Sequence, residues 1–291
     1  MLTNIQLEDI ASQKVLISDL PSSDLLEFCK IANQRYRDGS PIISDEDYDF
    51  IFIPELLKRY PNHPFFQKIE AENEGFSEEK IKLPEKMLST DKAYSWEEIN
   101  RWLERITKFS KEINYSLNDI QIKGTAKLDG FAGYDDGTKF YTRGDGNKGS
   151  DISRVFERGL GIFNDSRRGQ GPGEIVVKRS YFEKHLANDF EYPRNFQASL
   201  IKEKDLDRFA VNAISEKAAL FVPFTQLPQW LGSIDEFSTE FLDIVRQLEG
   251  GVDFDIDGVV FEIVNPELKE YMGSNRKFHR WQIAFKENKE K

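Results

Sequence analysis

The sequence predicts an α+β protein in which a small helical domain precedes a larger domain of antiparallel sheets flanked by helices. Apolar residues recur at helical spacing through roughly the first 60 residues. From Gln121 onward, short β-prone runs alternate with glycine and aspartate turns. Residues 59–80 are rich in proline and charge and have no period, which is typical of a linker. We therefore expect one domain over residues 1–75 and a second over residues 76–291.

In the first domain, one helix has an apolar face formed by Leu25, Leu26, Phe28, Ile31 and Ala32. Asp38-Gly39 should end this helix. A second helix should start near Ser44, because the acidic turn Asp45-Glu46-Asp47 suits the positive end of a helix dipole. Pro54 should break or kink that second helix.

The second domain should begin with a helix, since Ser95-Trp96-Glu97-Glu98 has the form of a capping box. Strands are expected in the runs QIKGTAKL, FAGYDDGTKFYT, GEIVVK, ALFVPF and DGVVFEIV. The turn Asp136-Gly137 should join two of these strands in a hairpin.

The composition narrows the class of protein. With 39% apolar residues the chain can bury a substantial core. Its net charge of −11 argues against a protein that grips DNA phosphates by bulk electrostatics. No apolar run has the roughly 18–20 residues that a membrane helix needs, and the N-terminus lacks the layout of a signal peptide. We therefore expect a cytoplasmic protein without a membrane partner.

Candidate chemistry begins at Lys127-Leu128-Asp129-Gly130, at the end of a β-prone run. Alone, this motif is more typical of a surface turn. It is followed by TRGDG, which contains Arg143, by Gly173-Glu174, by DIDGVV and by RWQIAFK. The glycines of TRGDG allow a close approach of backbone to a ligand, and Arg143 suits a phosphate or a ring. Each motif is weak alone, but their order and spacing are jointly specific.

On these motifs the chain resembles the N-terminal part of bacterial NAD-dependent DNA ligases, within the covalent nucleotidyltransferase superfamily. The resemblance identifies Lys127 as the nucleophile of a KxDG motif and Glu174 as a contact to the adenosine ribose. YPRN resembles the family's NPRN, DIDGVV with Asp257 its fourth motif, and RWQIAFK with Lys286 its fifth.

The N-terminal resemblance points to NAD. SPIISDEDYD is similar to the segment that holds the nicotinamide mononucleotide (NMN) half, which implies contacts from Asp45, Tyr48 and Asp49. Tyr36 would stack on nicotinamide. MLSTDKAY resembles the family's MLSLDNAF and implies that Ser89 and Thr90 lie near the nucleotide.

The implied reaction is attack of Lys127 on the α-phosphate of NAD, which forms lysyl-AMP and releases NMN. An amine attacks phosphorus only when neutral, so a cation such as Lys286 or a metal ion should lower the pKa of Lys127. Arg143, Lys286 and Mg²⁺ are the candidates to neutralise the phosphate; the ligands of the metal are unknown. Glu174 and Asp129 are expected to orient the ribose and the lysine, and Phe224 to stack on adenine.

Several positions depart from the family pattern, among them Arg35-Tyr36 in place of the family's Tyr-His pair. Thr125 stands where the family usually has a glutamate near adenine, and Glu262 stands in place of the motif-four lysine. A carboxylate there would repel the AMP phosphate. This leaves two alternatives to an active enzyme. One is a degenerate nucleotide-binding subunit, and the other is an ATP-dependent ligase or capping-type transferase, against which the SDEDYD segment argues.

The chain ends five residues after Lys286, without the oligonucleotide-binding (OB) barrel, zinc and helix-hairpin-helix modules of a full bacterial ligase. We therefore expect a transient, weak contact with nicked DNA, with those modules supplied either by a missing part of a longer ligase or by a second ligase subunit. The chain alone should adenylylate itself without efficient ligation.

Overall fold

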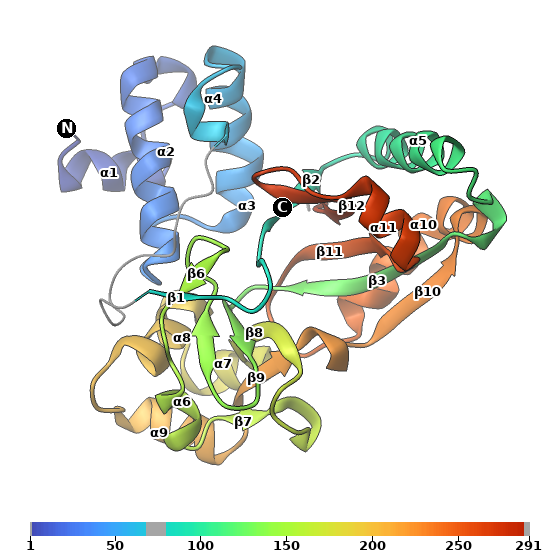
Figure 1. Cartoon of the computed structure of the whole chain (residues 1–291). Coiled ribbons are helices and arrows are strands. Elements are labelled where there is room, and N and C mark those ends of the chain that lie inside the picture. Colours follow the sequence, from blue (N-terminus) through green and yellow to red (C-terminus); the bar gives the residue numbers. More distant parts are fainter. Residues whose placement is uncertain (1, 68–79, 288–291) are drawn as a thin grey trace.

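The computed structural model describes residues 2–67 and 80–287. The first part is helical, as predicted, and forms the blue unit of Figure 1. Its helices are α1 (Asn4–Ala11), α2 (Ser22–Arg37), α3 (Asp45–Asp47) and α4 (Ile53–Arg59), with short 3-10 turns at Ile17–Asp19 and Pro64–Gln67. The predicted boundary at residue 75 lies outside the described residues.

The apolar face of α2 packs as expected, with Leu25 and Phe28 fully buried and the Phe28 and Phe52 rings 4.8 Å apart. Ser44 caps α3 by accepting a 3.0 Å hydrogen bond from the Asp47 amide. The expected break at Pro54 does not occur. The chain instead widens into a π turn at Tyr48–Phe52, and Pro54 lies in the first turn of α4, where a missing amide hydrogen costs little.

Two five-stranded sheets form the framework of the second part (Figure 1). The first has the order β10 (Gln229–Ser233), β3 (Gln121–Leu128), β11 (Ile256–Ile263), β12 (Phe278–Phe285) and β2 (Ser89–Ala93). The second has the order β5 (Phe140–Thr142), β4 (Phe131–Asp135), β8 (Gly171–Val177), β9 (Ala219–Pro223) and β7 (Gly161–Ile162). A short pair joins β1 (Ile81–Lys82) to β6 (Lys148–Gly149).

All five predicted β-prone runs form strands, and Asp136-Gly137 turns the β4–β5 hairpin. The sheets are not purely antiparallel, however, because β12 pairs with β2 and β7 pairs with β9 in parallel. Parallel partners need a long connection rather than a hairpin, so local turn signals did not predict them.

The helices of the second part are α5 (Trp96–Glu112), α6 (Arg154–Glu157), α7 (Arg179–His185), α8 (Pro193–Lys202), α9 (Arg208–Ser215), α10 (Ile234–Gly250) and α11 (Pro266–Met272). Ser95 caps α5 by accepting from the Glu98 amide at 3.3 Å. The box is not reciprocal, since Glu98 accepts from the Tyr94 amide instead. None of the helices in residues 2–67 and 80–287 has both the length and the apolar character needed to cross a membrane.

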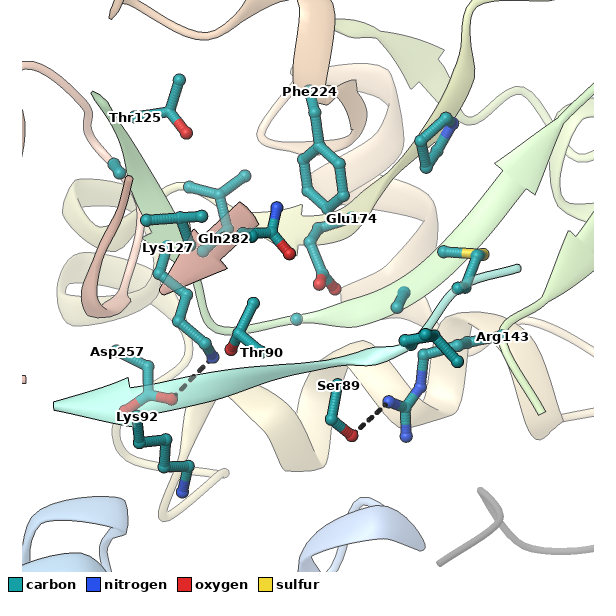
Figure 2. Close-up of a pocket in the computed structure, with 18 of the residues that line it drawn as sticks. Ser89, Thr90, Lys92, Thr125, Lys127, Arg143, Glu174, Phe224, Asp257 and Gln282 are labelled. Carbon is teal, nitrogen blue, oxygen red and sulfur yellow. Dashed lines mark hydrogen bonds and ion pairs between the residues drawn. The ribbon is translucent and has the colours of Figure 1, made fainter. Parts of the chain in front are cut away.

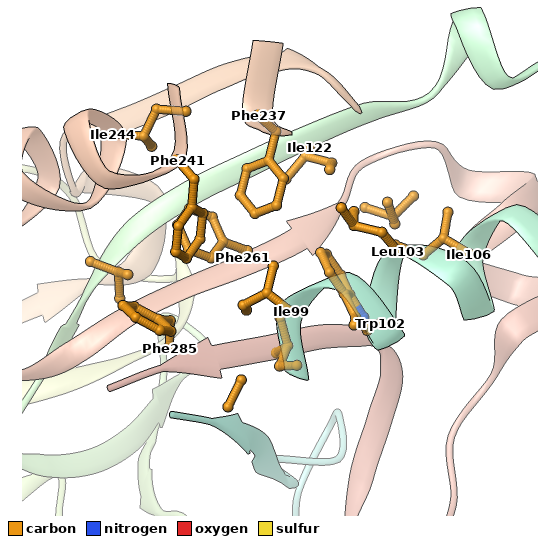
Figure 3. Packing of buried hydrophobic residues seen from close by; sticks show 14 of the residues in the cluster. Ile99, Trp102, Leu103, Ile106, Ile122, Phe237, Phe241, Ile244, Phe261 and Phe285 are labelled. Atoms are coloured by element: carbon orange, nitrogen blue, oxygen red, sulfur yellow. The ribbon is translucent and has the colours of Figure 1, made fainter. Parts of the chain in front are cut away.

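The main core lies between the first sheet and helices α5 and α10 (Figure 3). Trp102 of α5 is fully buried there, and Phe237 of α10 meets Phe261 of β11 with ring centroids 4.8 Å apart. A second core, around Phe140 and Phe221, lies against the other sheet. These cores make the two sheets rigid walls on which side chains can be held in place.

The helical unit docks on the second part through Arg194 of α8, in the YPRN segment. The Arg194 guanidinium lies 3.9 Å from the Tyr36 ring centroid and 4.3 Å from that of Phe131. Its Nε donates to the Tyr36 carbonyl at 2.7 Å, and the Tyr36 hydroxyl donates to Asp129 at 2.6 Å. The helical unit is therefore fixed at the edge of the space between the sheets.

Candidate active site

Strand β3 presents alternate residues to a cavity. Its even-numbered residues from Ile122 to Leu128 are buried, while Lys123, Thr125 and Lys127 share the opposite, partly exposed face. That face borders a cavity of about 520 Å³ enclosed by both sheets and the helical unit. Lys127 thus reaches a concave space of the size that binds small molecules.

Apart from Asp129, every residue expected at the site lines this cavity. They are Tyr36, Asp45, Tyr48, Asp49, Ser89, Thr90, Thr125, Lys127, Arg143, Glu174, Phe224, Asp257, Glu262 and Lys286. Asp129 is not among the lining residues, and its carboxylate accepts from Tyr36 and pairs with Arg194 at 3.5 Å. In this structure Asp129 therefore contacts the helical unit, whereas the carboxylate in contact with Lys127 is Asp257.

The carboxylate partner of Lys127 is Asp257. The Lys127 Nζ lies 2.8 Å from Asp257 Oδ2 (Figure 2), and Asp257 Oδ1 lies 2.6 Å from the Lys286 Nζ. Lys286 also pairs with Asp49 of the helical unit, which in turn lies 2.9 Å from the Lys92 Nζ. A continuous ion network therefore runs from the helical unit to the side chain of Lys127.

A bulge in β11 positions Asp257. The register with β3 shifts between Ile256 and Val259, and Gly258 has a φ of +105°. A Cβ on Gly258 would lie 2.2 Å from the Phe285 carbonyl oxygen, so only glycine fits this bulge. In the DIDGVV motif, the glycine is therefore needed for the backbone bulge and the aspartate Asp257 for the contact with Lys127.

The network sets the charges of its members. Burial acts to raise the pKa of Asp257, but Lys127 and Lys286 outweigh it and hold that pKa far below the usual range. Burial also lowers the pKa of Lys286, yet Asp257 and Asp49 raise it well above its usual value. For Asp45, burial and the charges of Asp129 and Asp257 raise the pKa to about 8. The cluster therefore keeps a buried cation and a carboxyl group that titrates near neutrality.

The other end of the cavity has a different character. Figure 2 shows Phe224 and Glu174 facing the same space, with Arg143 close to Ser89. The Arg143 Nη1 donates to the Ser89 Oγ at 3.3 Å, and the Phe224 ring is 38% exposed. An exposed aromatic face beside a carboxylate and a guanidinium suits a nucleoside with its phosphate.

Glu262 is neutralised by its surroundings. Its carboxylate lies 2.5 Å from the Lys123 Nζ and accepts from the Gln282 amide at 3.1 Å. Glu262 pairs in register with Lys123, which is four strand positions from Lys127, or about 13 Å at ~3.3 Å per residue. The expected repulsion of a phosphate at Lys127 is therefore weakened by both distance and charge.

Other residues of the cavity were not singled out from the sequence, among them Lys92, Lys123, Gln282 and Arg194. The alternation of side chains along β3 could have indicated Lys123, because it is four residues from Lys127 and so lies on the same face of the strand. Gln282 and Arg194 lie inside the quoted motifs RWQIAFK and YPRN. Lys92 had no such signal, because the family segment MLSLDNAF has asparagine at that position.

Within residues 2–67 and 80–287, no group of three or more metal-binding side chains gathers. Magnesium bound mainly through substrate phosphates needs only one or two protein carboxylates, so Mg²⁺ stays a prediction from the resemblance.

Comparisons with known proteins agree with the motifs. Residues 76–210 match the family model of the NAD-dependent DNA ligase adenylation domain. The chain is 60% identical over 290 residues to a DNA ligase of Vesicomyosocius okutanii, covering 100% of this chain and 46% of the relative. It is 52% identical over 287 residues to a DNA ligase of Desulfotalea psychrophila, covering 98% of this chain and 42% of that protein. A DNA ligase of Shewanella baltica is 48% identical over 282 residues, covering 97% and 43%.

The chain spans about half the length of these relatives. The match covers both the helical unit and the part that holds Lys127, since it includes essentially the whole chain. The chain belongs to the NAD-dependent DNA ligase family, with an adenylation domain at residues 76–210.

Proposed function

We propose that this chain performs the first step of NAD-dependent ligation, the transfer of AMP from NAD to Lys127. The neutral amine attacks the adenylyl phosphorus and forms a P–N bond. The P–O bond to NMN breaks, and its electron pair stays on the NMN phosphate. Lys127 loses one proton before the attack and a second one after it, both to water, and Asp257, 2.8 Å away, orients this nitrogen.

The observation that carries the proposal is the position of Lys127 at the junction of two environments. On one side lie the buried ion pairs of Asp257, Lys286 and Asp49. On the other lies the cavity with Phe224, which suits a nucleoside. In this reaction the protein mainly positions the groups and neutralises charge, and both kinds of group are present.

The two halves of NAD are assigned to the two parts of the chain. In the proposal Phe224 stacks on adenine, Glu174 binds the ribose, and Arg143 with Ser89 and Thr90 contacts the nucleotide. Tyr36, Asp45, Tyr48 and Asp49 of the helical unit bind the NMN half, with Lys286 at the phosphates. The helical unit and the adenylation domain are thus two parts, residues 1–75 and 76–291, of one binding site. Mg²⁺ would add positive charge at the phosphates when bound.

Intact-mass measurement tests the proposal. The chain is incubated with Mg²⁺ and either NAD or ATP, and a gain of one AMP with NAD alone is expected. Lys127→Ala should abolish the gain. A gain with ATP would select an ATP-dependent transferase, and no gain would favour a degenerate subunit. The pairing of Glu262 with Lys123 supports the active form, because it offsets the negative charge that raised this alternative.

Transfer of the AMP to nicked DNA, and nick sealing, are proposed for the longer protein that the relatives represent. Residues 1–291 alone should charge Lys127 but seal nicks slowly, since their net charge of −11 gives little general affinity for phosphates. An OB-fold part, in the same longer chain or in a second subunit, would bind the DNA. A gel assay of a nicked duplex with the purified chain tests this, and sealing at ordinary ligase rates would refute it.

A further inference from the structure

Lys92 is the least expected residue of the cavity. It lies in β2, opposite Ala284 of β12, and its Nζ is 2.9 and 3.2 Å from the two Asp49 oxygens. Figure 2 shows its side chain extending beside Asp257, at the same end of the cavity as the Lys127 nitrogen. Two lysines therefore enter this end of the cavity from different strands.

The three lysines of the ion network, Lys92, Lys127 and Lys286, differ in how exposed they are, and this separates their roles. Lys286 is 5% exposed and is held between Asp49 and Asp257. Lys127 is 25% exposed, but as the nucleophile it must be neutral when it reacts. Lys92 is 40% exposed and is held by one carboxylate. Among the described residues of the network, Lys92 is the cation that a ligand can reach most easily.

The charges of the network also leave room for an anion. Lys92, Lys127 and Lys286 bring three positive charges, against two negative ones from Asp49 and Asp257. Burial and the charge of Lys286 lower the pKa of Lys92, which means that they disfavour its charged form. An anionic group placed beside the ammonium would stabilise that charged form. Once Lys127 is neutral, the charges of Lys92 and Lys286 balance those of Asp49 and Asp257, and Lys92 is the more exposed of the two remaining cations.

We propose that Lys92 is a further catalytic residue, whose ammonium binds the pyrophosphate of NAD and neutralises the charge that collects on its oxygens as the bond to NMN breaks. This inference rests on the proposed function. It gives the active site a cation at a position where the family's MLSLDNAF segment has asparagine. The motif-four lysine is absent, and its place is taken by Glu262, which is paired with Lys123.

The test measures the single-turnover rate of AMP attachment at saturating NAD, together with NAD affinity. Lys92→Asn introduces the family residue and removes the charge, and should slow the step about 100-fold, the usual effect of losing one stabilising donor. Lys92→Arg keeps the charge and should stay within about 10-fold of the unmodified chain. The reverse reaction, attack of NMN on the charged lysine, should slow by the same factor as the forward one in Lys92→Asn.

A matched control is Lys139→Asn, an exposed lysine of the β4–β5 hairpin that lies 3.7 Å from Asp151 and outside the cavity. Its rate should not change. If Lys92 only holds Asp49, Lys92→Asn would alter thermal stability and NAD affinity but keep the rate at saturating NAD, which overturns the proposal. Lys92→Gln gives the same comparison if the asparagine variant does not fold. A chain that gains no AMP before any substitution would overturn the proposed function itself.

Discussion

Replacing Lys286 with methionine is expected to lower the free energy of unfolding by about 3 kcal/mol. Lys286 is buried and shared between Asp49, which is 4% exposed, and Asp257, which is 12% exposed. Removal of one partner of a buried ion pair destabilises proteins by about 3–5 kcal/mol. Asp49 keeps Lys92 and Asp257 keeps Lys127, so the lower end of this range applies.

The effect should depend on pH in one direction. Because the pKa values of Asp49 and Asp257 are held below the usual 3.8, the stability that they contribute is present above that pH and is lost as pH falls below it. The raised pKa of Lys286 places the loss of its contribution well above pH 10.5. The difference between the two proteins should therefore be constant from about pH 5 to 7, below the titration of Asp45, and shrink below about pH 4.

Urea unfolding followed by tryptophan fluorescence measures this difference. The control is Lys217→Met, because Lys217 and its partner Asp165 are 62% and 76% exposed and such pairs contribute at most about 1 kcal/mol. A loss below about 1 kcal/mol for Lys286→Met, or one equal to that of the control, would refute the reasoning that the network is a buried unit.

Three further outcomes are expected. The pKa of Asp45 is raised to about 8, so its carboxylate becomes ionised between pH 6 and 9 and can then attract the nicotinamide cation. Calorimetry with the Lys127→Ala chain, which cannot react, should therefore find NAD affinity rising over this range. Asp45→Asn should flatten the rise. Phe224→Ala should weaken NAD binding by about 1–3 kcal/mol through lost stacking, with little change in melting temperature; unchanged affinity would show that adenine lies elsewhere. Gly258→Ala should destabilise the chain by more than about 2 kcal/mol in thermal unfolding, whereas Gly250→Ala, with nothing within 4 Å of the new Cβ, should be neutral or stabilising; equal effects would contradict the bulge argument.

Local patterns in the sequence predicted the separate elements well. The run QIKGTAKL forms β3 with the predicted bounds, because the alternation of buried and exposed residues is complete within these eight residues. Strand β2 was not predicted, and its parallel pairing with β12 joins residues 89–93 to residues 278–285. Such a pairing is decided by tertiary packing, so no local pattern could indicate it.

The site was predicted mainly through resemblance, and its internal contacts were not. Motif order brought Lys127, Asp257 and Lys286 into one cavity, but the contact of Lys127 with Asp257 was not predicted. Spacing along the chain carries no information on an ion pair between residues 49 and 286, which are 237 positions apart. Lys92 lay outside the prediction for a related reason, since a residue that departs from a family motif has no counterpart from which a role can be transferred.

The pairing of β2 with β12 has a consequence for biosynthesis. While a ribosome is still adding residues 278–286, the sheet has an open edge beside β11, and neither Asp49 nor Asp257 has yet received Lys286. Contacts of such long sequence separation form slowly and late in folding. A nascent chain therefore carries Lys127 throughout the synthesis of residues 128–285 before the charge environment around that amine is complete, and competence to react should arise only when β12 and Lys286 have been added.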